Sequence, residues 1–296
     1  MKPAPFAYTR PTTIEEALIA LASDPYAKVL AGGQSLVPLL SMRLAAPALL
    51  VDINGLAELE TIHVSEAGEG VVRIGALARH AAVEADEDVR RVQPLISNAL
   101  KLVAHPTIRN RGTTVGSIVH ADASAEMPAV LMLLDGSVTV RSVDGERTIG
   151  VHDLFVGPLE SSLAPNEIAV SAQFPALAEG TGVACDEVAR RHGDYALCGV
   201  AAVVGVDGAG AVTSARAAYW SMGDVPVAVD LTEAFVGGRL SDEHLAAAAE
   251  LALPHLEATE DIHATADYRA QLARVLTRRV VRAAYDDAVA RRETNS

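Results

Sequence analysis

The chain contains little cysteine and little lysine, and each shortage excludes a class of protein. Its 296 residues include only two cysteines, Cys185 and Cys198. Two thiols cannot supply the four ligands of an iron–sulfur cluster or a zinc–thiolate site, so we expect reduced structural thiols in a cytoplasmic protein. Lysine occurs only at Lys2, Lys28 and Lys101, and the formal net charge is −14. Such a chain lacks the basic surface that nucleic acids and anionic lipids require.

Long apolar runs and the common catalytic motifs are also missing. The longest apolar run, residues 196–206, is too short to cross a bilayer and predicts a buried strand. The first eight residues lack the apolar stretch of a signal peptide, so we expect neither secretion nor a membrane span. No G-x-G-x-x-G, P-loop, H-E-x-x-H or G-x-S-x-G is present, which argues against nicotinamide, P-loop, zinc-protease and serine-hydrolase chemistry. We therefore expect a bound cofactor to supply the chemistry.

A two-glycine block follows an apolar run at residues 29–31 and precedes a helical pattern over 35–44. This order predicts a strand, a tight turn and a helix N-terminus. Free backbone N–H groups at such a turn, together with the helix dipole, suit an anion such as a phosphate. Glycine allows the backbone to approach the ligand closely. The block consists of Ala31, Gly32, Gly33, Gln34, Ser35 and Leu36.

A second block about eighty residues later has similar chemistry, with Thr113, Thr114, Gly116 and Ser117 predicted on a tight turn. Taken alone, either block is more often a simple connection between a strand and a helix. Two of them in one chain predict a pyrophosphate held from two sides. The nearby His120, Asp122 and Glu126 imitate a metal cluster, but such groups at a loop–helix junction are more often capping groups, and we predict no metal.

These blocks and their flanks resemble the FAD-binding (medium) subunit of molybdenum hydroxylases, the family of carbon monoxide dehydrogenase and of bacterial xanthine and nicotine dehydrogenases. Residues 28–40, with Arg43-Leu44 and 51–53, are similar to the start of that subunit. Residues 105–113, 120–122 and 125–130 resemble its second motif. Residues 193–196 and 267–269, with Arg278-Arg279, match its C-terminal region. The resemblance covers nearly the whole chain in the right order.

Hydrophobic spacing and the resemblance together predict an α+β fold. A two-lobed FAD-binding domain of the PCMH type is expected at residues 1–177, with lobes at about 1–55 and 56–177. Pro175, Gly180 and Gly182 indicate a linker. Beyond it, residues 178–296 should form a smaller domain with a three-stranded antiparallel sheet and a bundle of three helices. Further expectations are a helix capped by Thr13-x-x-Glu16, single helices over 89–103, 125–134 and 267–290, and strands near 183–189, 197–206 and 211–221.

The resemblance implies that FAD lies between the two lobes and the C-terminal domain. The first block would then hold the pyrophosphate, and residues 113–117 would hold its other side and approach the flavin. Asp122 would hydrogen-bond the cofactor or cap the following helix. Ile168 would pack on an apolar face of the cofactor or belong to the core. Tyr195 would lie near the isoalloxazine ring.

One position departs from the family pattern. The family pattern is Gly-Thr-(Ile/Val)-Gly-Gly-Ser, and here Val115 stands where the first glycine of that pair is expected. A one-residue slip would instead align Val115 with the Ile/Val, but it requires a compensating deletion before Asp122. Because β-branched residues avoid positive φ, we expect Val115 to be extended with its side chain away from the phosphates. Gly116 would then make the closest backbone approach. FAD would still bind, and Val115→Gly would keep or tighten that binding.

The resemblance also implies a function and partners. A molybdopterin centre on a large subunit would hydroxylate carbon monoxide, an aldehyde or a nitrogen heterocycle, and the sequence leaves these substrates open. Electrons would pass through [2Fe–2S] clusters on a small subunit to FAD on this chain and then to an external acceptor, within a dimer of heterotrimers. Two alternatives stay open: a self-sufficient FAD-dependent oxidoreductase and a non-enzymatic nucleotide-binding scaffold.

Overall fold

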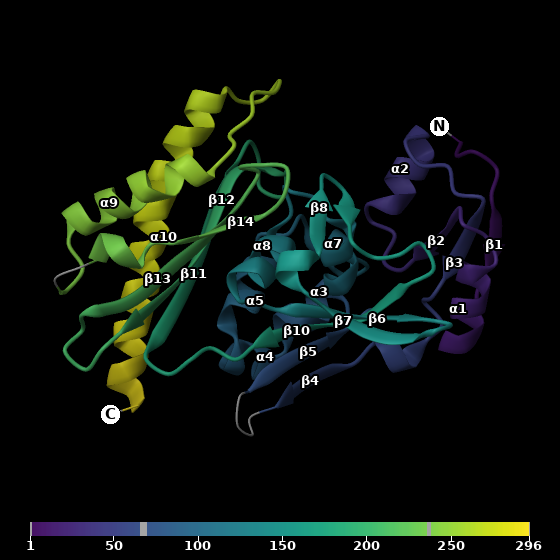
Figure 1. Ribbon diagram of the computed structural model, residues 1–296, viewed down its shortest axis with the longest axis horizontal. Helices are drawn as coiled ribbons and strands as arrows, with labels where there is room; N and C mark the ends of the chain where they lie inside the picture. The colour runs from purple at the N-terminus through teal and green to yellow at the C-terminus, as the bar shows by residue number, and fades with distance from the viewer. Residues whose placement is uncertain (1, 66–69, 236–237, 296) are drawn as a thin grey trace.

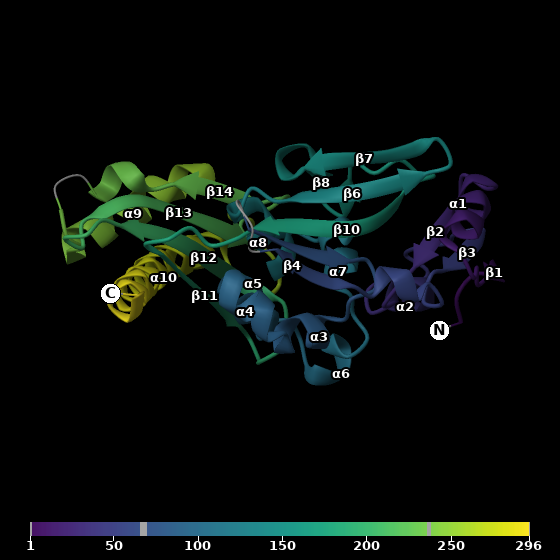
Figure 2. The same cartoon turned by 90° about the horizontal axis from the view of Figure 1, so that it is seen from below.

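The protein is elongated, with the first lobe and the C-terminal helix at opposite ends (Figure 1). The structure is a computed structural model that describes residues 2–65, 70–235 and 238–295. Of the four sheets in the described residues, the three larger ones follow one another along the long axis, and helices fill the space between the second and the third (Figure 2). Within the described residues, no helix is both long and apolar enough to cross a membrane.

The first lobe is a three-stranded parallel sheet in the order β1-β3-β2. The predicted cap at Thr13 and Glu16 is present. Thr13 Oγ1 accepts from Glu16 N at 3.2 Å, and the Glu16 carboxylate accepts backbone hydrogen bonds from Thr12, at 2.8 Å, and from Thr13. The elements are β1 (Ala7–Thr9), α1 (Ile14–Ala22), β2 (Ala27–Leu30), α2 (Leu36–Met42) and β3 (Leu49–Asp52).

The second lobe is a five-stranded antiparallel sheet in the order β4-β5-β10-β6-β7. The single helix predicted over 89–103 is wrong. It is two helices, because Pro94 begins a new helix and Gln93 before it leaves the helical region at φ −141°. The elements are η1 (Ala57–Leu59), β4 (Ile62–Ser65), β5 (Val71–Gly75), α3 (His80–Ala85), α4 (Glu87–Val92), α5 (Pro94–Leu100), α6 (Pro106–Arg109), α7 (Thr114–His120), α8 (Glu126–Leu133), β6 (Ser137–Ser142), β7 (Gly145–Gly150), η2 (Val151–Asp153), β8 (Phe155–Gly157), β9 (Glu160–Ser161) and β10 (Ile168–Pro175).

The C-terminal region contains a four-stranded antiparallel sheet, so the predicted three strands were one too few. The extra strand, β14, has only four residues and directly follows a turn, which leaves no readable alternation. The predicted third helix is also wrong: among the described residues after β14, the α-helices are α9 and α10, accompanied by 3₁₀ turns. The elements are β11 (Thr181–Ala189), β12 (Ala196–Val206), β13 (Val212–Trp220), β14 (Val227–Asp230), η3 (Thr232–Phe235), α9 (Asp242–Ala252), η4 (Leu253–His255) and α10 (Ala266–Asn295).

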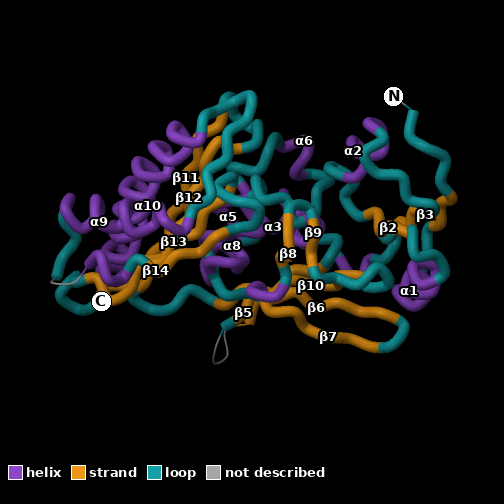
Figure 3. The backbone as a smooth tube through the Cα atoms, turned by 45° about the horizontal axis from the view of Figure 1, so that its top comes forward, coloured by secondary structure: helices purple, strands orange, loops and turns teal. Residues whose placement is uncertain are grey.

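This last sheet is covered on both faces. Helices α9 and α10 run along one face, and α5 and α8 of the second lobe pack on the other (Figure 3). Strand β12 is therefore buried along nearly its whole length, as its apolar run predicts. Val183, Ala196 and Trp220 belong to the same hydrophobic core as both lobes. The region after residue 177 thus shares a core with the region before it.

Candidate functional site

A cleft of about 930 Å³ lies where the two lobes and the C-terminal region meet. That volume is typical of a site for a small molecule or cofactor. Its walls come from the β2–α2 loop, from the segment between α5 and α8, from residues 159–169 and from residues 193–195. All predicted site residues except Thr114 line it: Ala31, Gly32, Gly33, Gln34, Ser35, Leu36, Thr113, Val115, Gly116, Ser117, Asp122, Ile168 and Tyr195.

The β2–α2 loop, residues 31–35, needs its two glycines for different reasons. A Cβ on Gly32 would lie 2.5 Å from Arg111 O and 2.8 Å from Gly112 Cα, so this loop packs directly on the backbone of the second segment. Gly33 has φ +72°, which L-residues with side chains rarely adopt. The first glycine lets two backbones touch, and the second lets the loop turn.

The loop also presents a row of unused donors. Within the described residues, the N–H groups of Gly32 through Leu36 donate to no protein acceptor, and the first helical bonds run from Val37 N to Gly33 O and from Leu39 N to Ser35 O. Ser35 occupies the N-cap position without capping through its side chain. Unpaired N–H groups that line a cleft are suited to an anion.

The second segment is not the tight turn that we predicted. Thr113 is the N-cap of α7, and its Oγ1 accepts from Gly116 N at 3.2 Å. Thr114 N donates to Ala78 O, and Ser117 N donates to Thr113 O. A helix begins here because a threonine cap replaces the positive-φ glycine that a tight turn needs. Most backbone N–H groups of residues 113–117 therefore already have a protein acceptor.

Val115 and Thr114 differ from expectation. Val115 lies inside α7, so the predicted extended backbone is wrong, although φ is not positive. Its side chain is 1% exposed and belongs to the core. Thr114 is fully buried and does not line the cleft, and its hydroxyl bonds Nδ1 of His80, a lining residue, at 3.2 Å. Burial, with the charge of Arg109, lowers the pKa of His80 to about 4, which keeps this imidazole neutral.

Asp122 and Tyr195 face each other from different parts of the chain. Asp122 Oδ1 accepts from Ser124 N at 2.9 Å, and the N-cap position of α8 belongs to Ala125, so Asp122 does not cap the following helix. Partial burial at the cleft wall, together with the negative charge of Asp122, raises the pKa of Tyr195 to about 12. Tyr195 therefore stays a neutral phenol, while 65% of its surface remains exposed at the edge of the cleft.

Two carboxylates interact next to the cleft: Glu126, which lines it, and Glu187 on β11. Burial and the charge of Glu187 raise the pKa of Glu126 to about 8. Burial and the charge of Asp186 raise the pKa of Glu187 to about 7, although Trp220 Nε1 donates to its carboxylate at 3.0 Å. Within the described residues, no three His, Cys, Asp or Glu side chains are placed to hold a metal ion.

Several wall residues were missed by sequence reasoning. Lys28, His105, His120 and Glu126 line the cleft, as does the stretch 159–165 between β8 and β10. Two of these positions could have been found from the sequence: Lys28 comes shortly before the glycine block, on the strand that leads into it, and His120 lies close to Asp122. The stretch 159–165 has no recognisable sequence signal, because strands β8 to β10 determine where it lies.

The C-terminal region contributes its wall through a close contact. Gly193 has φ +85°, and a Cβ there would lie 2.5 Å from the His105 ring. His105 also packs edge-on against His192 at 5.8 Å between ring centroids. This contact holds Asp194 and Tyr195 in the wall of the cleft.

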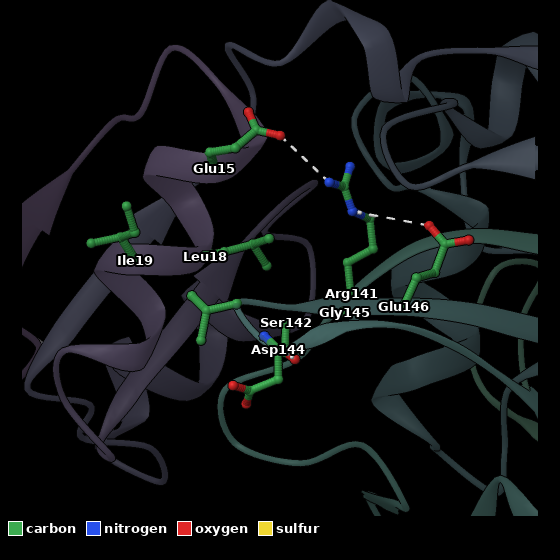
Figure 4. Close-up of a pocket in the computed structure, with 9 residues that line it drawn as sticks. Glu15, Leu18, Ile19, Arg141, Ser142, Asp144, Gly145 and Glu146 are labelled. Carbon is green, nitrogen blue, oxygen red and sulfur yellow. Dashed lines mark hydrogen bonds and ion pairs between the residues drawn. The ribbon is translucent and has the colours of Figure 1, made fainter.

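A separate cleft lies between α1 and the β6–β7 hairpin and contains none of the predicted site residues (Figure 4). Arg141 crosses it, 3.4 Å from Glu15 and 4.0 Å from Glu146. The two lobes are thus tied at the surface as well as through their shared core.

Comparisons with known proteins agree with this arrangement. Residues 4–177 match the model for the FAD binding domain in molybdopterin dehydrogenase, and residues 184–284 match the CO dehydrogenase flavoprotein C-terminal domain. The chain is 42% identical to the 6-hydroxypseudooxynicotine dehydrogenase complex subunit alpha of Paenarthrobacter nicotinovorans, over 95% of each chain. It is 39% identical to the caffeine dehydrogenase subunit beta of Pseudomonas sp. strain CBB1, over 97% of each.

The structure of quinoline 2-oxidoreductase from Pseudomonas putida 86 superposes with a TM-score of 0.91 at 36% identity, covering 97% of this chain and 99% of that one. The chain belongs to the FAD-binding subunits of the molybdenum hydroxylases. It is the FAD-carrying subunit of an oxidoreductase complex, and in this family the molybdenum and iron–sulfur centres belong to other subunits. The α+β fold, with an FAD-binding domain followed by a C-terminal domain, is confirmed.

The residues present fit this cofactor. The N–H groups of Gly32 through Leu36 suit a pyrophosphate, and a Cβ at either glycine would disturb the loop that presents them. The cleft also offers apolar walls, at Leu39 and Ile168 among others, on which an aromatic ring can pack.

Proposed function

We propose that the β2–α2 loop holds the FAD pyrophosphate through the N–H groups of Gly32 through Leu36, with the Ser35 hydroxyl as a further donor. The supporting observation is a run of adjacent residues that line the cleft and whose N–H groups, within the described residues, have no protein acceptor. Thr113, Gly116 and Ser117 form the opposite wall, with the α7 N-terminus adding partial positive charge.

The flavin end lies, in this proposal, towards Asp122, Ile168 and Tyr195. Ile168 is 1% exposed and serves the core and the cleft wall together. The neutral Tyr195 phenol forms the exposed edge, where it can stack on a ring and limit access from solvent. FAD, when bound, accepts electrons singly and releases them singly or in pairs.

We further propose that electrons reach this chain from a small [2Fe–2S] subunit, that substrate is hydroxylated on a large molybdopterin subunit, and that the complex is a cytoplasmic dimer of heterotrimers. Two observations support this. The relatives are subunits of complexes, and Cys185 and Cys198 are free thiols, which suits a reducing compartment. Co-expression with the neighbouring reading frames, followed by native mass measurement and metal analysis, tests the assembly.

The isolated chain tests the cofactor assignment. We expect about one FAD for each chain, released on denaturation, and no iron or molybdenum. The yellow protein should not oxidise a substrate without its partners. Turnover of an organic substrate by the isolated chain would support the self-sufficient oxidoreductase instead. A colourless chain that takes up no FAD would support the nucleotide-binding scaffold.

The names of similar proteins suggest a substrate class for the complex. The three compared proteins are named for 6-hydroxypseudooxynicotine, caffeine and quinoline, all of which contain a nitrogen heterocycle. We propose that the complex hydroxylates such a ring. The purified complex should reduce an artificial acceptor with quinoline, nicotine or caffeine, and faster than with carbon monoxide or aldehydes. The reverse order of rates would contradict this.

A further inference from the structure

A chain of hydrogen bonds behind the cleft joins the two backbone segments that face each other across it. Asn54 Nδ2 donates to Ala31 O in the β2–α2 loop at 2.8 Å. Asn54 Oδ1 accepts from Arg79 Nη2 at 2.7 Å, and Arg79 Nη1 donates to Arg111 O at 2.7 Å. Arg111 O is the atom on which Gly32 packs. One side-chain pair therefore bridges the same two segments that touch through Gly32.

The orientation of the Asn54 amide is determined by its neighbours. Asp52 Oδ1 accepts from Asn54 Nδ2 at 2.6 Å and from Asn54 N at 2.9 Å, and Asp52 Oδ2 accepts from Tyr8 OH at 2.5 Å. Burial opposes ionisation of Asp52, but the bonds from Tyr8 and Asn54 outweigh it and lower its pKa. An ionised carboxylate only accepts, so Nδ2 faces Asp52 and Oδ1 is left for Arg79.

Arg79 holds the second segment with its main chain as well. It pairs with Thr113 in an antiparallel bridge, and the next residue, His80, donates its N–H to Gly112 O at 2.9 Å. Thr113 is the cap of α7. Neither Asn54 nor Arg79 is among the residues that line the cleft. Both therefore act on a bound cofactor through the loops and not by touching it.

We propose that Asn54 and Arg79 are positioning residues for the FAD pyrophosphate. Their clamp, the bonded path from Ala31 O through Asn54 and Arg79 to Arg111 O, sets the separation and register of the two loops across the cleft. The planar guanidinium makes this possible, because its fork bonds Asn54 and Arg111 O together, which a single ammonium on a flexible stem does not reproduce. This inference rests on the FAD site proposed above.

The test uses the full chain, stripped of flavin and titrated with FAD, ADP and FMN by fluorescence or calorimetry. The variant Arg79→Lys keeps the positive charge and removes the fork. We expect it to bind FAD and ADP about 10- to 100-fold more weakly, the effect of losing charge-assisted hydrogen bonds. Arg73→Lys is the matched control, since Arg73 bonds Ser171 Oγ at 3.0 Å on the same lobe and does not line the cleft. Wild-type affinity in Arg79→Lys would overturn the clamp.

Two further readouts separate positioning from general support of the fold. Asn54→Ala should weaken FAD and ADP similarly, and adding it to Arg79→Lys should cause little more loss, because both remove one path. FMN, which lacks the pyrophosphate, should lose no more than about twofold. Multiplicative losses in the double variant, or equal losses for all three ligands, would overturn the clamp. Wild-type protein that binds no FAD would instead overturn the proposed site itself.

Discussion

The two backbone segments that face each other across the cleft both place glycine near a hydroxyl residue, but their structures differ. The first, at Gly32 and Gly33, leaves its N–H groups Gly32 through Leu36 without protein acceptors. The second, at Thr113 to Ser117, is a capped helix start whose N–H groups mostly bond to Ala78 O and to Thr113. A glycine near a serine or threonine therefore does not by itself indicate a phosphate site. What matters is whether the turn leaves its donors unpaired.

The comparison also separates two uses of glycine. Gly32 is required by a backbone that touches it, and Gly33 by a positive φ. At Gly116, in contrast, a Cβ would meet only the Thr113 hydroxyl at 2.5 Å. The glycines of the first segment are constrained by main chain, and the glycine of the second by one side chain. Substitutions at these glycines should therefore differ in their effects on FAD content and on stability.

The largest effect on FAD content is expected from Gly32→Ala. The new methyl would lie 2.5 Å from Arg111 O, and neither backbone can move aside without separating the two segments. We expect purified protein with almost no FAD and a free energy of unfolding lower by about 1–3 kcal/mol, the usual cost of overpacking. Flavin absorbance and urea unfolding measure the two effects. Normal flavin content would show that the segments do not need this contact.

Gly33→Val should follow. A β-branched residue at φ +72° is strained by about 1–3 kcal/mol, so the loop will leave the conformation that presents its N–H groups. FAD binding should be lost while the circular dichroism spectrum stays that of a folded protein. A variant with full flavin content would mean that the loop is structural only.

Val115→Gly is expected to be costly in stability, an effect separate from the retained or tighter FAD binding that the sequence predicts for this variant. The side chain is 1% exposed within the core, and glycine in a helix adds to the loss. Removing it should lower the free energy of unfolding by about 2–4 kcal/mol. Calorimetry of the flavin-free chain checks this. An unchanged melting temperature would indicate that valine at this position is needed for the shape of the cleft and does not stabilise the core.

Stability should also depend on pH, because Glu126 lines the cleft beside α7 and its carboxylate interacts with that of Glu187 on β11. Their pKa values of about 8 and about 7 are raised above the unfolded value, so the folded chain retains protons that the unfolded chain releases. The free energy of unfolding should therefore fall between about pH 5 and pH 8, by at most about 1.4 kcal/mol per pH unit for each group. Glu126→Gln should flatten that slope in denaturant titrations, and identical slopes would contradict the assignment.

The smallest effect is expected from Gly116→Ala. Displacing the Thr113 hydroxyl costs about 1 kcal/mol of capping, and alanine returns a similar amount of helix propensity. Stability should change by less than about 1 kcal/mol and FAD content should stay close to that of the wild type. A loss as large as that of Gly32→Ala would show that the two segments are equivalent after all.

Local features were predictable from the sequence, and features that depend on distant partners were not. The first loop follows from a strand, two glycines and a helix over six residues, and the capped helix at Thr13 from a four-residue motif. Thr114 is turned inward by His80, thirty-four positions away, and no local pattern carries that information. The Asn54–Arg79 pair likewise spans twenty-five positions. Short elements such as β14 are not predicted, because four residues are too few to show a hydrophobic periodicity.

The contact of Gly193 with the His105 ring has a consequence for how a bound cofactor would stabilise the chain. Residues 193–195 form part of the cleft wall but belong to the C-terminal region, so a molecule bound there would be enclosed by two parts of one chain. We therefore expect FAD bound in this cleft to contact both regions and to raise the melting temperature of the core that they share.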